Sequence, residues 1–453
     1  MQIQFLGATG TVTGSKYLLR HEGATLMVDC GLFQGYKQLR LRNWDPLPVV
    51  PSTVDALILT HAHLDHTGYL PLLVKQGFRG KVFCTQATRE LCSIMLPDSG
   101  HLQEEEAAYA NRHGFSKHKP AAPLYTEADA RQALKLIEPI DFLQPWSPAP
   151  GFKARLTPSG HMMGSAFVRI EGGGRSILFT GDLGRPNDLV LKPPMPMPGA
   201  DYLVTESTYG DRLHEPVDVL AQLAQVIKRT AARGGVLVIP SFAVGRAQTL
   251  MYCIHLLKQR GAIPQQLPVF LNSPMAADAT EVYWRHRDQH RLGQEECAAM
   301  CHAAQIINTA DESRALNERR GPMVIIAASG MATGGRVVHH LKAFAPDWRN
   351  TILLTSFQAG GTRGAAMVGG ARTIRIHGQD VPVRAEVAVL GNLSGHADAD
   401  EILAWLRGFE RPPLKSFITH GEPPAADALR QRMERELGWT CQVPEYLETV
   451  ELS

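Results

Sequence analysis

Three histidines and one aspartate fall within six residues, in the stretch HAHLDH at positions 61–66, which directly follows the apolar run 56–59. Four such groups are hard to place in a core, because each buried imidazole or carboxylate needs a hydrogen-bond partner. At the tip of a strand the same side chains can converge on a divalent metal ion. Nitrogen and oxygen donors without thiolate favour Zn²⁺ or a similar borderline ion. A solvated polar loop is the alternative, and the density of the pattern argues against it.

The hexapeptide cannot supply all the ligands of two ions, so further ligands must come from other strand ends. Three candidates lie in short polar turns: His161 in SGHM, Asp182 in TGD and His420 in THG. Each alone would more often be an ordinary surface or core residue, but beside the hexapeptide each is predicted to bind metal. Asp29, in VDCG, also ends a strand. Its carboxylate could hydrogen-bond a ligating imidazole, or it could simply form a turn.

The elements that must position these residues follow an α/β pattern. In the first 200 or so residues, short apolar runs end at polar turns, which predicts strands. From about Tyr209 strands and helices alternate, which predicts a parallel sheet. The predicted strands are 3–6, 16–19, 25–28, 56–59, 81–84, 166–170, 176–179, 202–205, 235–239, 268–271, 323–327, 351–355, 373–376, 386–390 and 416–419. The predicted helices are 127–136, 217–231, 246–258, 275–285, 336–343 and one capped by Asp398 or Asp400.

The composition is that of a globular protein. The chain has 453 residues, of which 44% are hydrophobic and 20% charged, which predicts two or three domains and argues against disorder. The net charge of +2 argues against a histone-like nucleic-acid binder. No apolar run approaches the roughly 20 residues of a membrane helix, and the first residues do not resemble a secretory signal. We therefore expect a cytoplasmic protein without a membrane partner, whose scattered cysteines are reduced.

At these residues the chain resembles the metallo-β-lactamase superfamily. Asp29, the hexapeptide 61–66, His161 and Asp182 match four early motifs of that superfamily in order. The resemblance implies an αββα sandwich with a dinuclear zinc site. It does not choose a substrate, because thioesterases, lactamases and nucleases share the fold.

The rest of the chain resembles the β-CASP nucleases, and in particular the nuclease subunit of the pre-mRNA 3′-end cleavage factor and its bacterial relatives. TESTYG at 205–210, SGHAD at 394–398 and FITHG at 417–421 look like their motifs A, B and C. GRAQ at 245–248 and the SGM turn that begins at Ser329 also fit. This resemblance implies a metallo-β-lactamase domain of residues 1–208 and 373–453. It implies an inserted α/β domain, a parallel sheet with flanking helices, at 209–372.

The resemblance also implies a role for each site residue. One zinc would be held by His61, His63 and His161, the other by Asp65, His66 and His420, and Asp182 would bridge them, with Mn²⁺ as an alternative ion. Glu206 would orient His396, the general acid, while Asp65 would also serve catalysis. A metal-bridging hydroxide would attack the phosphodiester, leaving 5′-phosphate and 3′-hydroxyl ends. Endonuclease and 5′-to-3′ exonuclease action both remain open.

Candidate RNA contacts come from the insert and its end. The turn that contains Ser329 and Gly330 follows an apolar run and precedes a helix, where backbone N–H groups can cradle phosphate; a plain tight turn is the alternative. Ser394, Arg246 and Arg336 are further candidates, although surface arginines are usually just solvated. Residues 209–372 hold 18 Lys and Arg against 12 Asp and Glu, a net of +6. This excess suits a polyanion such as single-stranded RNA.

We therefore expect a zinc-dependent ribonuclease of RNA processing or degradation. A thioester or lactam hydrolase on the same metal core is the alternative, but such an enzyme would not need the long insert. A non-catalytic RNA-binding scaffold is a third hypothesis, and the presence of all seven predicted metal ligands argues against it. The resemblance also allows a homodimer.

Overall fold

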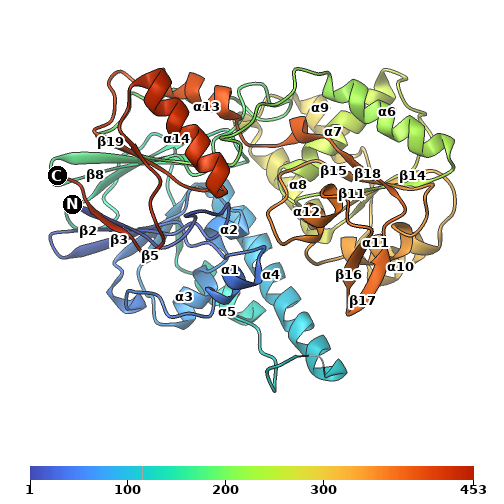
Figure 1. Ribbon diagram of the computed structural model, residues 1–453, viewed down its shortest axis with the longest axis horizontal. Helices are drawn as coiled ribbons and strands as arrows, with labels where there is room; N and C mark the ends of the chain where they lie inside the picture. The colour runs from blue at the N-terminus through green and yellow to red at the C-terminus, as the bar shows by residue number, and fades with distance from the viewer. Residues whose placement is uncertain (115) are drawn as a thin grey trace. The chain divides into compact units, whose positions relative to one another are not determined.

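The computed structural model describes residues 1–114 and 116–453 and divides the chain into two compact units (Figure 1). Unit 1 comprises Met1–Leu213 and His396–Ser453, and unit 2 comprises His214–Gly395. This division differs from the expected boundaries, chiefly at the second one, which was expected at 372/373. The reason is that β18 (Glu386–Val389) pairs in parallel with β15 (Thr351–Leu354), so residues 373–395 complete unit 2.

Unit 1 is built on two sheets whose inner faces share one core. The aromatic rings of Phe5 and Phe417, one from each sheet, have centroids 5.1 Å apart, and those of Tyr17 and Phe179 lie 5.4 Å apart. The first sheet has the order β21-β1-β2-β3-β4-β5-β6, with β1 (Gln2–Phe5), β2 (Tyr17–His21), β3 (Ala24–Val28), β4 (Ala56–Ile58), β5 (Lys81–Cys84), β6 (Ile137–Pro139) and β21 (Thr449–Glu451). The second has the order β20-β19-β10-β9-β8-β7, with β7 (Lys153–Pro158), β8 (Ala166–Gly172), β9 (Arg175–Phe179), β10 (Tyr202–Thr205), β19 (Lys415–Ile418) and β20 (Cys441–Gln442).

Helices cover the outer faces of both sheets of unit 1 (Figure 1). On the second sheet, Leu403 and Leu429 pack with Leu203 of β10 in one buried cluster. The helices are α1 (Lys37–Leu41), α2 (Leu64–Thr67), α3 (Leu70–Lys75), α4 (Gln86–His113), α5 (Glu127–Leu134), α13 (Ala399–Leu406) and α14 (Pro423–Leu437). The expected αββα sandwich is confirmed.

Parallel strands bring their carboxyl ends to one edge of each sheet. In the first sheet β3 and β4 are parallel and lead to Asp29 and His61. In the second sheet β9, β10 and β19 are parallel and lead to Asp182, Glu206 and His420. The middle strand β10 is buried at every position, as expected of a parallel strand covered on both faces. The topology therefore gathers the candidate site residues of unit 1 at strand ends.

Unit 2 is a parallel sheet with flanking helices, as expected. Its sheet has the order β13-β12-β14-β11-β15-β18, and an antiparallel pair of strands, β16 (Thr373–Ile376) and β17 (Gln379–Pro382), adjoins it in the chain. The other strands are β11 (Val236–Pro240), β12 (Val269–Asn272), β13 (Gln305–Ile306) and β14 (Met323–Ala327). The helices are α6 (Val219–Ala232), α7 (Arg246–Gln259), α8 (Pro274–Arg285), α9 (Gln294–Cys301), α10 (Ala310–Glu318), α11 (Val337–Phe344) and α12 (Arg363–Val368).

Several elements were not predicted, and three of them show how weak the local signal can be. Helix α4 contains Pro97, and its buried residues are concentrated in its first half, so it lacks a continuous apolar stripe. Helix α14 opens on two prolines, which suit a first helical turn but resemble a loop in the sequence. Strand β7 alternates buried and partly exposed residues and has no apolar run. Within residues 1–114 and 116–453, no helix combines the length and hydropathy that a bilayer crossing requires.

Candidate metal centre

Two groups of metal-binding side chains meet on the carboxylate of Asp182, which is 2% exposed. In the first group, Asp182 Oδ2 lies 3.3 Å from His61 Nε2 and 3.3 Å from His161 Nε2. His63 Nδ1 completes this group, 3.1 Å from His61 Nε2 and 3.2 Å from His161 Nε2. Four donor atoms from three separate loops thus surround one point.

The second group faces the other oxygen of the same carboxylate. Asp182 Oδ1 lies 3.3 Å from His66 Nε2. His420 Nε2 is 3.2 Å from His66 Nε2 and 3.3 Å from Asp65 Oδ2. Although it is buried, Asp182 Oδ1 accepts no hydrogen bond from any residue that the structure describes. A carboxylate with one oxygen in each group has the arrangement of a bridging ligand.

Hydrogen bonds to the far side of each ring orient the imidazoles of the second group. His66 Nδ1 lies 2.7 Å from Asp29 Oδ2, and a carboxylate can only accept, so in a neutral His66 ring the lone pair is on Nε2. Burial alone would lower the pKa of His66, but the carboxylates of Asp182 and Asp29 outweigh it and raise the pKa well above its usual value. The hydroxyl of Thr208 lies 3.1 Å from His420 Nδ1 and 3.3 Å from the carbonyl of His420. The Nε2 atoms of His66 and His420 lie 3.2 Å apart, a separation that two ligands of one metal ion can have.

Thr60 fixes the ring of His61 in the same way. Its hydroxyl donates to Asp29 Oδ2 at 2.9 Å, so towards His61 Nδ1, 3.0 Å away, it can only accept. The backbone N–H of Thr60 also donates to Asp29 Oδ1, at 2.7 Å. One buried carboxylate thus holds two imidazoles in the tautomer that points Nε2 at the candidate ion sites.

The spacing and chemistry of both groups fit Zn²⁺. A tetrahedron with Zn–N distances of about 2.0–2.1 Å has edges of about 3.3 Å. Four separations between donor atoms of the first group, His61–His63, His63–His161, His61–Asp182 and His161–Asp182, are 3.1–3.3 Å. Burial lowers the pKa of His61 to about 3 and that of His63 to about 4, so both rings are neutral at pH 7 and can donate lone pairs.

The loops that carry these ligands pack too closely for most residues. A Cβ added to Gly31 would lie 1.6 Å from the carbonyl oxygen of Asp65. Gly181 has a φ of +50°, and a Cβ there would lie 2.7 Å from the Cβ of Thr60. Glycine is thus required at positions 31 and 181, where two other loops pack against Asp65 and against Thr60.

Backbone hydrogen bonds hold the hexapeptide against the loop between β1 and β2 and the loop after β3. The N–H of Ser15 donates to Asp65 O at 2.8 Å, and that of Leu32 to Leu64 O at 2.9 Å. The buried ammonium of Lys16 donates to the carbonyl of Gly31 and lies 4.5 Å from the centre of the Phe33 ring. Burial lowers the pKa of Lys16 to about 8. These contacts anchor the turn from which Asp65 and His66 project.

His396 lies beside the ligand groups and is held by Glu206. Its Nδ1 is 2.9 Å from Glu206 Oε2, and its Nε2 is 3.9 Å from Asp182 Oδ2. Glu206 is itself fixed, because its Oε1 accepts from the N–H of Leu183 at 2.6 Å. Burial alone would lower the pKa of His396, but the carboxylates of Glu206 and Asp182 outweigh it and raise the pKa to about 9. The ring thus presents Nε2 to the centre while Nδ1 donates to Glu206.

The structure gathers the predicted ligands and His396 in unit 1 but places the predicted RNA contacts in unit 2. These are Arg246, Ser329, Gly330, Arg336 and Ser394. Arg336 donates to Asn272 Oδ1 and to the carbonyls of Ile307 and Asn308, at 2.6–2.9 Å. Arg246 is 5% exposed and donates to the carbonyl of Leu393. Both guanidinium groups therefore hold loops within unit 2.

Hydrogen bonds within unit 2 hold the turn after β14. The hydroxyl of Ser329 lies 3.0 Å from that of Thr333, and the carbonyl of Gly330 accepts from Gln358 Nε2 at 3.1 Å. Ser394 is buried, and its N–H donates to Gly391 O at 2.9 Å.

Sequence reasoning missed Thr60 and Thr208, which orient His61 and His420. Thr60 immediately precedes the hexapeptide, and Thr208 lies within the TESTYG motif. Their positions beside predicted site residues were the available signal. A threonine at a strand end is common, so its type alone does not distinguish this role.

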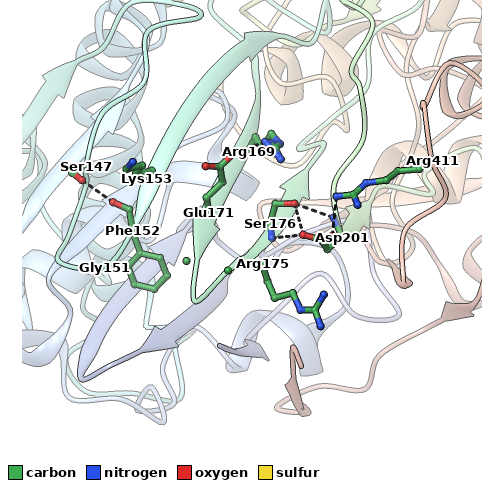
Figure 2. A pocket seen from close by; sticks show the side chains of 12 residues that line it. Ser147, Gly151, Phe152, Lys153, Arg169, Glu171, Arg175, Ser176, Asp201 and Arg411 are labelled. Atoms are coloured by element: carbon green, nitrogen blue, oxygen red, sulfur yellow. Dashed lines mark hydrogen bonds and ion pairs between the residues drawn. The ribbon is translucent and has the colours of Figure 1, made fainter.

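A separate hollow of about 560 Å³ lies in unit 1, at the amino-terminal side of β7 and β9 (Figure 2). Lys153, Arg169, Arg175 and Arg411 line it together with Glu171 and Asp201, and Arg411 pairs with Asp201 at 3.0 Å. Arg175 and Ser176, at the start of β9, line the hollow, whereas Asp182 follows the end of that strand. Because a strand rises about 3.3 Å per residue, the length of β9 separates the two. The hollow is therefore not part of the candidate metal centre.

Comparison with known proteins places these features in a family. The chain matches the models described as metallo-beta-lactamase superfamily at residues 9–85, Beta-Casp domain at 247–367, and Zn-dependent metallo-hydrolase RNA specificity domain at 380–444. It is 37% identical over 429 residues to Ribonuclease TTHA0252 of Thermus thermophilus, covering 93% of each chain. It is 31% identical to the transcription termination factor FttA of Methanosarcina mazei, covering all of this chain and 72% of that protein.

A solved structure supports the fold alone. The crystal structure of a protein of unknown function from Enterococcus faecalis V583 matches with a TM-score of 0.51 at 13% identity, covering 99% of each chain.

Replacing Asp29 by Asn should weaken metal binding. Asparagine tolerates the φ of +56° at this position, but an amide cannot accept all three hydrogen bonds that the carboxylate accepts. We expect a loss of roughly 10–100-fold in affinity for at least one ion, measured by competition with a chelator. Asp55→Asn is the matched control, because the exposed Asp55 also accepts a backbone N–H, at 2.7 Å, but faces no imidazole. Equal affinities in both variants would contradict this role.

Proposed function

The chain belongs to the β-CASP family of metallo-β-lactamase-fold nucleases and is a metal-dependent hydrolase, and from that premise we propose that it cleaves phosphodiester bonds of single-stranded RNA with two zinc ions. The observation that carries this proposal is the pair of donor groups that share Asp182, with His396 held beside them. The match to an RNA specificity domain and the ribonuclease among its relatives support RNA as the substrate.

In this proposal His61, His63 and His161 would hold one ion, Asp65, His66 and His420 would hold the other, and Asp182 would serve both. Imidazole and carboxylate donors also accept Mn²⁺, so the metal supply decides between the two. When bound, the ions supply hydroxide near neutral pH and neutralise charge on the phosphoryl oxygens.

The chain itself supplies the leaving-group proton. His396 Nδ1–H donates to Glu206, which fixes the orientation of the ring. When the ring is protonated, its second N–H, on Nε2, points to the centre. The departing ribose 3′-oxygen is a poor leaving group, and protonation by His396 Nε2 allows it to leave. This step gives products with 3′-hydroxyl and 5′-phosphate ends.

Unit 2 carries a net positive charge, which suits the part of the RNA strand away from the cleaved bond. Residues 214–395 contain 19 Lys and Arg against 13 Asp and Glu, so the net charge stays at +6 with the structural boundaries. We propose that the turn with Ser329 and Gly330 meets the RNA backbone. Arg246 and Arg336 would act through the loops that they hold, because their donors already face carbonyl groups.

The thioester or lactam hydrolase has no comparable support. Such an enzyme would share the donor groups of unit 1, but neither the matched RNA specificity domain nor the Beta-Casp domain would have a purpose in it.

Zinc-loaded protein should cleave single-stranded RNA, and the product ends test the chemistry. RNA labelled at the 5′ end and RNA labelled at the 3′ end are digested side by side. Internal products from both labels indicate endonuclease action, and mononucleotides from the 5′ end indicate exonuclease action. We expect products that a poly(A) polymerase extends, because their 3′-hydroxyl is free. Products with cyclic phosphate ends, or no cleavage, would overturn the proposal.

His396→Ala should reduce kcat on RNA by about 10²–10⁴-fold, the usual contribution of a general acid, with the bound metal unchanged. An activated leaving group needs no proton, so the same variant should lose much less on bis(4-nitrophenyl) phosphate. His101→Ala, which removes a half-exposed histidine of unit 1, is the control. Equal losses on both substrates would show that His396 is not the general acid.

A further inference from the structure

The segment between β3 and β4 exposes an unusual set of large apolar side chains. Tyr36 is 52% exposed, Leu41 50%, Trp44 57% and Val50 63%. Single exposed apolar residues are ordinary, but four within fifteen residues form a patch, and two of them are aromatic. Aromatic rings that face solvent beside a catalytic site are suited to contact a ligand.

The same segment is basic. Residues 35–50 contain Lys37, Arg40 and Arg42 but only one acidic residue, Asp45. Lys37 and Arg40 are exposed, whereas the guanidinium of Arg42 lies 4.2 Å from the centre of the Tyr446 ring. Interleaved aromatic and cationic side chains are typical of surfaces that bind single-stranded nucleic acid.

The segment is anchored at its base. The side chain of Asn43, 5% exposed, accepts from the N–H of Phe33 at 2.9 Å and donates to the carbonyl of Phe33 at 2.8 Å. The N–H of Gln34 donates to Thr13 Oγ1 at 3.1 Å. Asn43 directly precedes Trp44, so the backbone that carries the ring is fixed before any ligand binds. A fixed platform loses little conformational entropy on binding.

The anchor also sets the distance to the candidate metal centre. Leu32 donates its N–H to the carbonyl of Leu64, the neighbour of Asp65, at 2.9 Å. Tyr36 follows Leu32 by four residues, which can span at most about 14 Å. Asn43, the neighbour of Trp44, bonds to Phe33, which directly follows Leu32. Both rings therefore belong to the segment that is anchored beside Asp65, and nucleotides next to a scissile phosphate at the ions can extend towards them.

We propose that Tyr36 and Trp44 form a stacking platform for bases of the single-stranded substrate, with Lys37 and Arg40 meeting its phosphates. This inference rests on the proposed RNA hydrolysis and assigns part of its substrate binding to unit 1. A second copy of the chain is a poorer occupant, because it would bring the same excess of cations to the contact.

Trp44→Ala should raise KM for single-stranded RNA by about 10-fold, as expected for the loss of one stacked base, while kcat and bound metal stay unchanged. Trp44→Phe keeps a ring and should restore most of the affinity. Trp348→Ala is the matched control, since Trp348 is a 65% exposed tryptophan of unit 2. If the wild type cleaves RNA and Trp44→Ala has an unchanged KM, the stacking platform is wrong but the proposed RNA hydrolysis stands.

Abasic RNA separates stacking from charge. Oligonucleotides whose bases are removed next to the cleaved bond keep their phosphates, so wild-type protein should bind them about as weakly as the double variant Tyr36→Ala/Trp44→Ala binds intact RNA. The double variant should not distinguish the two RNAs. A further loss on abasic RNA in the double variant, or a changed oligomeric state of Trp44→Ala in sedimentation, would show a different role for the segment and overturn the proposal. A wild type that does not cleave RNA at all would overturn the proposed function first.

Discussion

The carboxylate of Asp182 is the group on which the rest of unit 1 depends. It is buried at 2% exposure and has histidine nitrogens within 3.3 Å of both oxygens. A buried anion is stable only when cations or hydrogen bonds compensate its lost hydration. The neutral ring of His61 turns a lone pair towards this carboxylate, so that ring cannot compensate the charge. A metal ion held between them would satisfy both groups.

Around this group the fold places loops from five strands. Parallel strands in each sheet end at the same edge, and glycines such as Gly31 and Gly181 allow the loops to touch. Asp29 shows how the support is shared, because one carboxylate fixes both Thr60 and His66. This explains how a hexapeptide and three separate loops can present ligands in fixed orientations.

Much of this could be predicted, because the ligands are of unusual types at strand ends. The hexapeptide, His161, Asp182 and His420 stand out by type and position, and the parallel sheets follow from the alternation of elements. The second domain boundary could not be predicted, because the pairing of β18 with β15 is not local. Whether an arginine such as Arg336 faces RNA or a loop carbonyl depends on tertiary contacts that its neighbours in sequence do not reveal. The exposure of Trp44 is likewise a property of the folded chain.

X-ray diffraction from zinc-loaded crystals, collected at the zinc absorption edge, tests the shared carboxylate most directly. The account predicts two anomalous peaks about 3.5–4 Å apart. One should lie among His61, His63 and His161, and the other among Asp65, His66 and His420. Each should lie within bonding distance of a different oxygen of Asp182. A single peak, or two peaks with Asp182 bound to only one of them, would contradict the account.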